Sequence, residues 1–168
     1  MKKILLITTI VSVFLACQKE AGKGGTSSVS GKVITYELSH FDVPGSNQRV
    51  DTLAYYYHAD EEVYIIYGDE DNYYDDSYET SFDGSFRFEN LRKGRYTVFI
   101  YSDCESDTTG LAVINQSNPV YAQQLASTIW NSDCVDGEVA VKMDIEITEN
   151  NKQYNLGDIS RFKIESNQ

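Results

Sequence analysis

The sequence predicts an all-β fold, an antiparallel β-sandwich of about seven strands. Residues 139–147 alternate apolar and polar side chains, which is typical of a strand with one buried face. Asp83-Gly84 lies between strand-like flanks and is a strong signal for a hairpin turn. Apolar residues fall at helical spacing in 122–130, so we expect at most one short helix, within an insertion at 111–133.

Seven segments are predicted as strands because they alternate or are rich in β-branched and aromatic residues. Lys93-Gly94 predicts a second turn, and residues 149–152 predict a third because asparagine tolerates positive φ. Phe162 and Ile164 are expected to point inward, and residues 55–57, three tyrosines, are expected to straddle a strand with alternate rings in and out. The predicted strands are 32–38, 62–67, 77–81, 86–88, 96–101, 139–147 and 159–164.

The first 16 residues are predicted to be a lipoprotein signal peptide. A basic start is followed by an apolar run, 4–16, which is shorter than the roughly 20 residues that a membrane-spanning helix needs. Phe14-Leu15-Ala16-Cys17 resembles the lipobox of bacterial lipoproteins. That resemblance implies cleavage before Cys17 and acylation of its thiol and amine. The alternative is an ordinary secretory signal with Cys17 as a free thiol.

Residues 17–29 are predicted to be the lipidated cysteine and a flexible tether, because they are small and polar. The sandwich domain is then expected over 30–165. Two or more acyl chains hold a protein stably at a membrane, so the membrane is an expected partner. Gln18 after the cysteine favours the outer membrane by resemblance to other lipoproteins, and Gln18-Lys19-Glu20 resembles the export signal of Bacteroidetes surface lipoproteins. We therefore expect an outer-membrane lipoprotein, facing either the surface or the periplasm.

Cys104 and Cys134 remain as an even pair after Cys17 is assigned to the lipid. Disulfides persist outside the cytoplasm, so this pair is predicted to form one. Closing a loop of this length stabilises a fold by ~3–4 kcal/mol in the chain-entropy model. The alternative is two buried free thiols.

Charge and motif content exclude several function classes. Lys plus Arg number 14 and Asp plus Glu number 26, which gives a net charge of −12 and argues against nucleic acid as a partner. The sequence contains no Gly-x-Ser-x-Gly, phosphate-loop or His-Glu-x-x-His motif, and its two histidines, His40 and His58, are isolated. We therefore expect no enzymatic activity and no cofactor, with calcium as the one exception considered below.

Residues 79–98 carry Thr80, Asp83-Gly84, an aromatic-x-aromatic pair, and then a Leu-x-x-Gly-x-Tyr-x-Val pattern. This stretch resembles the carboxypeptidase regulatory-like domain, and Ser30-Gly31-Lys32-Val33 fits that domain's first strand. The resemblance implies a prealbumin-like β-sandwich of seven strands. It carries no site, because its pattern consists of turn residues and core positions.

An acidic, aromatic stretch is the one unusual feature of the domain. Residues 51–83 hold eleven carboxylates and no Lys or Arg. Carboxylates in a loop could supply oxygen ligands to calcium, and tyrosines are enriched at recognition surfaces, which favours a glycan or protein contact. The third interpretation is a solvated hairpin loop. The candidate ligand or calcium residues are Asp69, Asp71, Tyr73, Tyr74, Asp75, Asp76 and Tyr78.

Two tripeptides, Asp51-Thr52-Leu53 and Asp107-Thr108-Thr109, resemble the O-glycosylation motif of Bacteroidetes exported proteins. Thr52 and Thr108 are therefore candidate modification sites. Taken together, these features predict a non-catalytic, lipid-anchored envelope protein that acts as a binding or accessory module for a glycan or a partner protein. The alternative is a structural subunit of an outer-membrane protein assembly.

Overall fold

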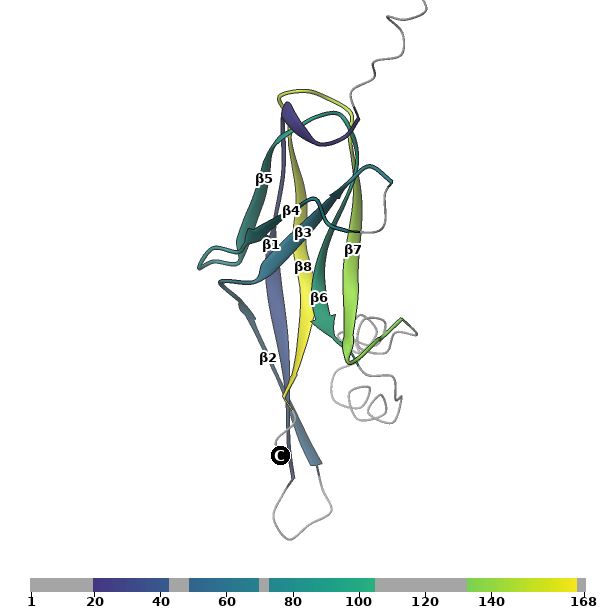
Figure 1. Ribbon diagram of the computed structural model, residues 1–168. Coiled ribbons are helices and arrows are strands. Elements are labelled where there is room, and N and C mark those ends of the chain that lie inside the picture. The colour runs from purple at the N-terminus through teal and green to yellow at the C-terminus, as the bar shows by residue number, and fades with distance from the viewer. Residues whose placement is uncertain (1–19, 43–48, 70–72, 105–132, 166–168) are drawn as a thin grey trace, which may run out of the picture.

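Two β-sheets pack face to face in the computed structural model of the chain, which describes residues 20–42, 49–69, 73–104 and 133–165 (Figure 1). The described residues form eight strands and no helix, which confirms the predicted all-β sandwich with one strand more than the seven expected. The helix considered at 122–130 lies outside the described residues. No helix in the described part of the chain has the length and hydrophobicity to cross a membrane.

The first sheet is built around β1 (Lys23–Asp42). On one side of β1 lies β8 (Gln153–Glu165), and on the other side lie β5 (Ser85–Leu91) and then β2 (Arg49–Tyr57). The change of partner falls near Val33, whose N–H donates to the carbonyl of Gly84 at 2.9 Å. β1 and β8 are parallel, so the expectation of a purely antiparallel sandwich is wrong at this one pair of strands. A parallel pair joins segments far apart in the sequence, which local patterns do not report.

The second sheet has the strand order β4-β3-β6-β7 and is antiparallel throughout. Its strands are β3 (Glu62–Tyr67), β4 (Asp76–Glu79), β6 (Gly94–Asp103) and β7 (Glu138–Ile147). The alternation predicted for β7 is confirmed, because Val139 and Ile147 are buried while Lys142, Asp144 and Glu146 are exposed.

Apolar side chains from both sheets fill the space between them. The burial of this much apolar area is the main favourable contribution to folding. Leu91 and Tyr96 are both buried in this cluster. The cluster comprises Val29, Val33, Phe86, Phe88, Leu91 and Ile159 from the first sheet and Val63, Ile65, Tyr96, Val98, Ile100 and Ile147 from the second.

Two turns form as the sequence predicts. Gly84 has φ +74°, and a Cβ there would lie 2.7 Å from the carbonyl oxygen of Val33, so only glycine fits. Asn151 has φ +56° in the turn between β7 and β8. Both turns connect strands of different sheets, β4 to β5 and β7 to β8, so neither closes a hairpin. The hairpin predicted at Asp83-Gly84 is therefore wrong, although the tight turn forms, because the chain crosses from one sheet to the other there.

The folded chain begins earlier than predicted. β1 starts at Lys23 rather than near Ser30, so the flexible tether predicted over 17–29 is wrong for its second half. Its serines are small enough to be buried: Ser27 is 2% exposed, and its hydroxyl donates to the carbonyl of Glu149 at 2.8 Å. Backbone pairing with neighbouring strands, rather than apolar side chains, therefore holds this segment.

Gly22, just before β1, is held by the hydroxyl of Tyr96. That hydroxyl accepts a hydrogen bond from the N–H of Gly22 at 2.9 Å and donates to the carbonyl of Arg92 at 2.8 Å. The N–H of Arg92 in turn donates to the carbonyl of Gly22 at 2.9 Å. Burial raises the pKa of Tyr96, so the phenol stays protonated and able to donate.

The opposite end of the sandwich is closed by polar groups. Among the described strands, β8 pairs with β1 alone, and side chains of β6 take up two of its backbone donors. Phe162 N–H donates to Ser102 Oγ at 2.8 Å, and Ile164 N–H donates to Asp103 Oδ2 at 2.8 Å. The two sheets are thus tied edge to edge as well as face to face.

The predicted disulfide between Cys104 and Cys134 is confirmed, with Cα atoms 5.9 Å apart. Cys104 directly follows β6 and Cys134 lies shortly before β7. The bond therefore joins the two ends of the insertion at the point where it leaves the second sheet.

Candidate functional site

A cluster of aromatic rings lies on the outer face of the second sheet. We call its four members, Tyr64 on β3, Tyr74 in the β3–β4 loop, and Phe99 and Tyr101 on β6, the aromatic surface. Tyr64 is the register partner of Phe99. Its ring centroid lies 5.1 Å from that of Phe99, 5.6 Å from that of Tyr101 and 4.6 Å from that of Tyr74. The four rings therefore form one contiguous patch.

The inner members of the aromatic surface support its outer members. Phe99 is buried and Tyr64 is half-buried, whereas Tyr101 and Tyr74 are 47% and 51% exposed. The Tyr64 hydroxyl donates to Glu62 Oε2 at 2.6 Å, and Ser77 Oγ donates to Glu62 Oε1 at 3.1 Å. Burial, followed by the Glu62 carboxylate, raises the pKa of Tyr64 well above its ordinary value. This ring is therefore fixed, and it stays uncharged.

A polar groove of about 470 Å³ adjoins the aromatic surface and is lined by residues of β6 and β7 and by Gly68 and Asp69, which follow β3. Arg95 and Thr97 of β6 lie opposite Glu146 and Asp144 of β7. Thr97 Oγ1 donates to Asp144 Oδ1 at 2.6 Å, and the Arg95 guanidinium pairs with Asp69. The groove therefore presents carboxylate oxygens and a guanidinium whose charge is already matched.

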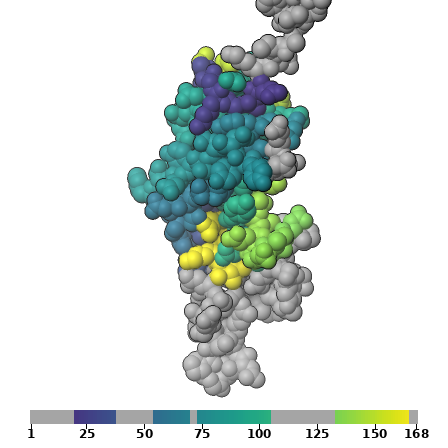
Figure 2. Space-filling view, viewed as in Figure 1, coloured from purple at the N-terminus to yellow at the C-terminus, as the bar shows by residue number. Residues whose placement is uncertain are grey.

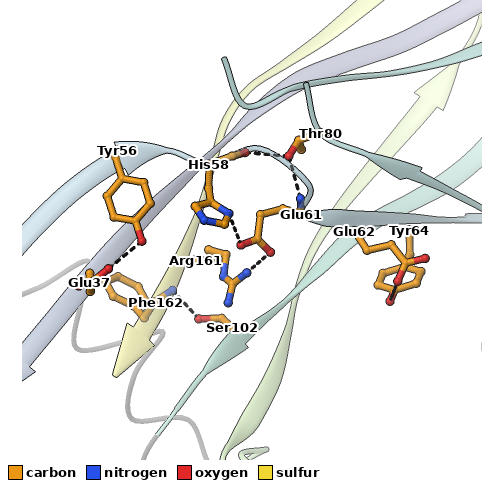
Figure 3. Close-up of polar contacts among 10 residues, drawn as sticks. All are labelled: Glu37, Tyr56, His58, Glu61, Glu62, Tyr64, Thr80, Ser102, Arg161 and Phe162. Carbon is orange, nitrogen blue, oxygen red and sulfur yellow. Dashed lines mark hydrogen bonds and ion pairs between the residues drawn. The ribbon is translucent and has the colours of Figure 1, made fainter. Parts of the chain in front are cut away.

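A second polar cluster lies near the loop that crosses from β2 to β3, where Glu61 and Arg161 are largely buried and His58 is half-exposed (Figure 3). His58 Nδ1 is 2.8 Å from Glu61 Oε1, and Arg161 of β8 pairs with the other oxygen of the same carboxylate. The Thr80 hydroxyl donates to the carbonyl of His58 at 2.7 Å and accepts from the N–H of Glu61 at 3.0 Å. Since its members bind one another, this cluster fastens the crossing loop to β8.

The predicted acidic loop does not gather its carboxylates. Asp69 pairs with Arg95, Asp75 accepts the Tyr67 N–H at 2.7 Å, and Asp76 Oδ2 lies 2.6 Å from Lys23 Nζ. These partners lie on β6, β3 and β1, so each of the three carboxylates is engaged by a different strand.

Among the described residues, no three His, Cys, Asp or Glu side chains are grouped as a metal ion would require. Asp71 lies outside those residues, so calcium binding by this loop stays a prediction.

The three tyrosines predicted for the same loop also separate. Tyr74 joins the aromatic surface, whereas Tyr78 packs its ring edge-on against Phe88 at 6.2 Å. Tyr73 is 87% exposed. The structure therefore brings one of the three to the aromatic surface, together with rings that the sequence analysis had not selected.

Phe99, Tyr101 and Tyr64 were missed because their aromatic side chains were used only as evidence for strands at 62–67 and 96–101. The alternation of side chains in β6, Gly94–Asp103, could have indicated these outward-facing rings. Its inward positions already supply Tyr96, Val98 and Ile100 to the core. Aromatic residues in the opposite phase of the alternation must then face outward.

Cys17 and Thr108 lie outside the described residues, and Thr52 lies in β2 at a position whose side chain is not described. Lipidation and O-glycosylation at these positions stay predictions. No protein-family model and no curated protein matches the chain.

Proposed function

We propose that this protein is a non-catalytic, lipid-anchored binding module of a bacterial cell envelope and that the aromatic surface is its recognition surface. The observation that carries the proposal is the pair of half-exposed rings, Tyr74 and Tyr101, supported from beneath by Tyr64 and Phe99. Tyrosine combines a large apolar ring with a hydroxyl and has few rotatable bonds, so it binds at a small entropic cost.

The placement of these rings on strands supports the same proposal. Tyr64, Phe99 and Tyr101 lie on adjacent strands of one sheet, which hold side chains more precisely than loops do. These three rings of the aromatic surface are therefore organised before a ligand arrives, and less conformational freedom is lost on binding. The proposed envelope location depends on the lipobox resemblance at Cys17.

Anchoring can be tested in a bacterial host that processes lipoproteins. The full chain is expected in the membrane fraction with a mass increase from acylation. Cys17→Ser is expected to abolish both, because the acylated residue is then missing. A wild-type chain found without acyl chains would rule out the anchor.

Recognition can be tested by placing the photo-crosslinking residue p-benzoylphenylalanine at position 101 in intact cells. Position 55 on the first sheet is the matched control, since Tyr55 is also a strand tyrosine and is 67% exposed. Adducts are expected from position 101 and not from position 55. Equal adducts from both faces would contradict a single recognition surface and favour a structural subunit of an assembly.

A further inference from the structure

The aromatic surface and the polar groove are parts of one continuous strip along β6. Outward residues Tyr101, Phe99, Thr97 and Arg95 follow one another at every second position, because alternate residues share a face. At about 3.3 Å per residue, the strip is roughly 20 Å long. Figure 2 shows the teal of the chain from β3 to β6 across the middle of the molecule, with green of β7 beside it.

We infer that this strip binds a glycan chain that carries no acidic groups, an inference that rests on the recognition surface proposed above. A pyranose ring presents a face of C–H bonds edged by hydroxyls. Such a face packs on an aromatic ring, whose π-electrons attract the slightly positive C–H hydrogens. Tyr101 and Tyr74 supply this kind of surface at one end of the strip.

The other end of the strip supplies hydrogen-bond acceptors for sugar hydroxyls. Asp144 has accepted one hydrogen bond from Thr97, and an ionised carboxylate has about four acceptor positions. Glu146 lies two residues further along β7, on the same face and opposite Arg95. Pairs of neighbouring sugar hydroxyls donate readily to such carboxylates, so a chain whose first rings stack on the tyrosines has polar partners for its next rings.

The charge of the strip selects against acidic glycans. Three carboxylates, Asp69, Asp144 and Glu146, surround the single guanidinium of Arg95 in the groove. Lys142, opposite Phe99, leaves the strip net negative, and the whole chain carries −12. Uronic, sulfated or phosphorylated sugars would therefore be repelled on approach and in the bound state.

A glycan fits this strip better than a protein partner does. A tyrosine side chain can bury about 150–250 Å², so two half-exposed rings offer about 200 Å² of additional burial. A stable protein interface buries about 800 Å² on each partner around an apolar core. The strip has two exposed rings and a polar groove, which is enough for a few sugar rings and too little for such a core.

The full-length protein, solubilised in detergent, can be tested by affinity electrophoresis in gels that contain one polysaccharide each. The probes are uncharged β-glucan, mannan and xylan, with alginate and polygalacturonate as acidic comparators. We expect at least one uncharged polysaccharide to retard the protein and neither acidic one to do so. Tyr101→Ala is expected to weaken that retardation by about tenfold or more.

Three variants connect the binding to the strip. Tyr101→Phe keeps the ring and should retain binding, Asp144→Asn removes a charged acceptor and should weaken it, and Tyr55→Ala on the other sheet should leave it unchanged. Unfolding midpoints equal to wild type will show that each variant is folded.

Several outcomes would overturn the inference: no retardation by any uncharged polysaccharide, retardation by the acidic ones instead, or equal losses from Tyr101→Ala and Tyr55→Ala. Protein adducts from position 101 without glycan binding would also overturn it, and would leave the proposed recognition surface standing.

Discussion

The interior of the sandwich has two halves that differ in chemistry although the same strands run through both. Within β1, Val33 is fully buried among apolar side chains, and Thr35, two positions later on the same face, is the register partner of Arg161. β8 changes in the same way, from Ile159 to Arg161. Near Val33 the interior therefore changes from an apolar half to a polar half, which contains Thr35, Glu37, Tyr56, Glu61 and Arg161.

The two halves are held together by different forces. In the apolar half, stability follows from the apolar area removed from water, and many combinations of apolar side chains can supply that area. In the polar half each group requires a specific partner: Glu61 binds Arg161, and the Tyr56 hydroxyl donates to Glu37 Oε2 at 2.7 Å. Thr35 Oγ1 and Arg161 Nε are buried without a hydrogen-bond partner in the described part of the chain. The apolar half therefore supplies most of the free energy of folding, and the polar half fixes the alignment of the strands at some cost in stability.

The sharpest test of this difference is a large-to-small substitution in the apolar half. Phe86→Ala should lower the free energy of unfolding by about 4 kcal/mol, because it removes a fully packed ring and leaves a cavity. Urea unfolding measures the change. Phe82→Ala is the matched control, since Phe82 is 90% exposed and should change stability by less than about 0.5 kcal/mol. Similar losses from both variants would contradict the assigned core.

In the polar half, Arg161→Met should cost about 2 kcal/mol, because Glu61 would keep a charge that is largely removed from water. Adding Glu61→Gln should restore part of this loss, since the unpaired charge is then gone. Arg87→Met breaks an exposed pair with Glu89 and should cost well under 1 kcal/mol. If Arg161→Met cost no more than Arg87→Met, the polar half would not depend on this pair.

The smallest effect is expected from alkaline titration of the apolar half. Burial, followed by the charges of Asp76 and Asp75, raises the pKa of Tyr67 to about 12 from an ordinary 10.0. The folded state thus holds this proton more tightly than the unfolded state does. The stability it contributes is complete below pH 10 and is lost as the pH rises from 10 to 12.

After allowance for solvent screening, the loss from Tyr67 is about 1 kcal/mol. Urea midpoints measured between pH 9 and pH 12 should therefore fall less steeply for Tyr67→Phe than for wild type. Tyr55→Phe, at an exposed position, should follow the wild-type curve. A Tyr67→Phe curve as steep as wild type would show that this phenol is not protected by the fold.

Local patterns predicted the strands that bury one face. The predicted strand 62–67 coincides with β3, and the alternation in 139–147 falls within β7. Both carry their signal within a few residues. The first half of β1 could not be found in this way, because Lys23 to Ser28 contains no large apolar residue and is held by pairing with β5 and β8.

The candidate site was less predictable than the fold. Tyr74 and Tyr78 are close in sequence, yet Tyr74 packs on Tyr64 at the outer face and Tyr78 packs on Phe88 at the sheet edge. Conversely, Tyr64 and Tyr101 are 37 positions apart and their rings are 5.6 Å apart. The aromatic surface depends on strand register, which a sequence pattern of one strand does not contain.

The hydrogen bonds between Tyr96 and Gly22 limit how far the domain can lie from a membrane to which Cys17 is anchored. Because Gly22 is fastened to the sandwich, only residues 18–21 separate it from Cys17. If Cys17 carries acyl chains, this connecting segment is at most about 18 Å long when fully extended. The domain would then lie close to the lipid headgroups, with little freedom to change its orientation relative to the membrane. The hairpin of β1 and β2 would point away from the bilayer.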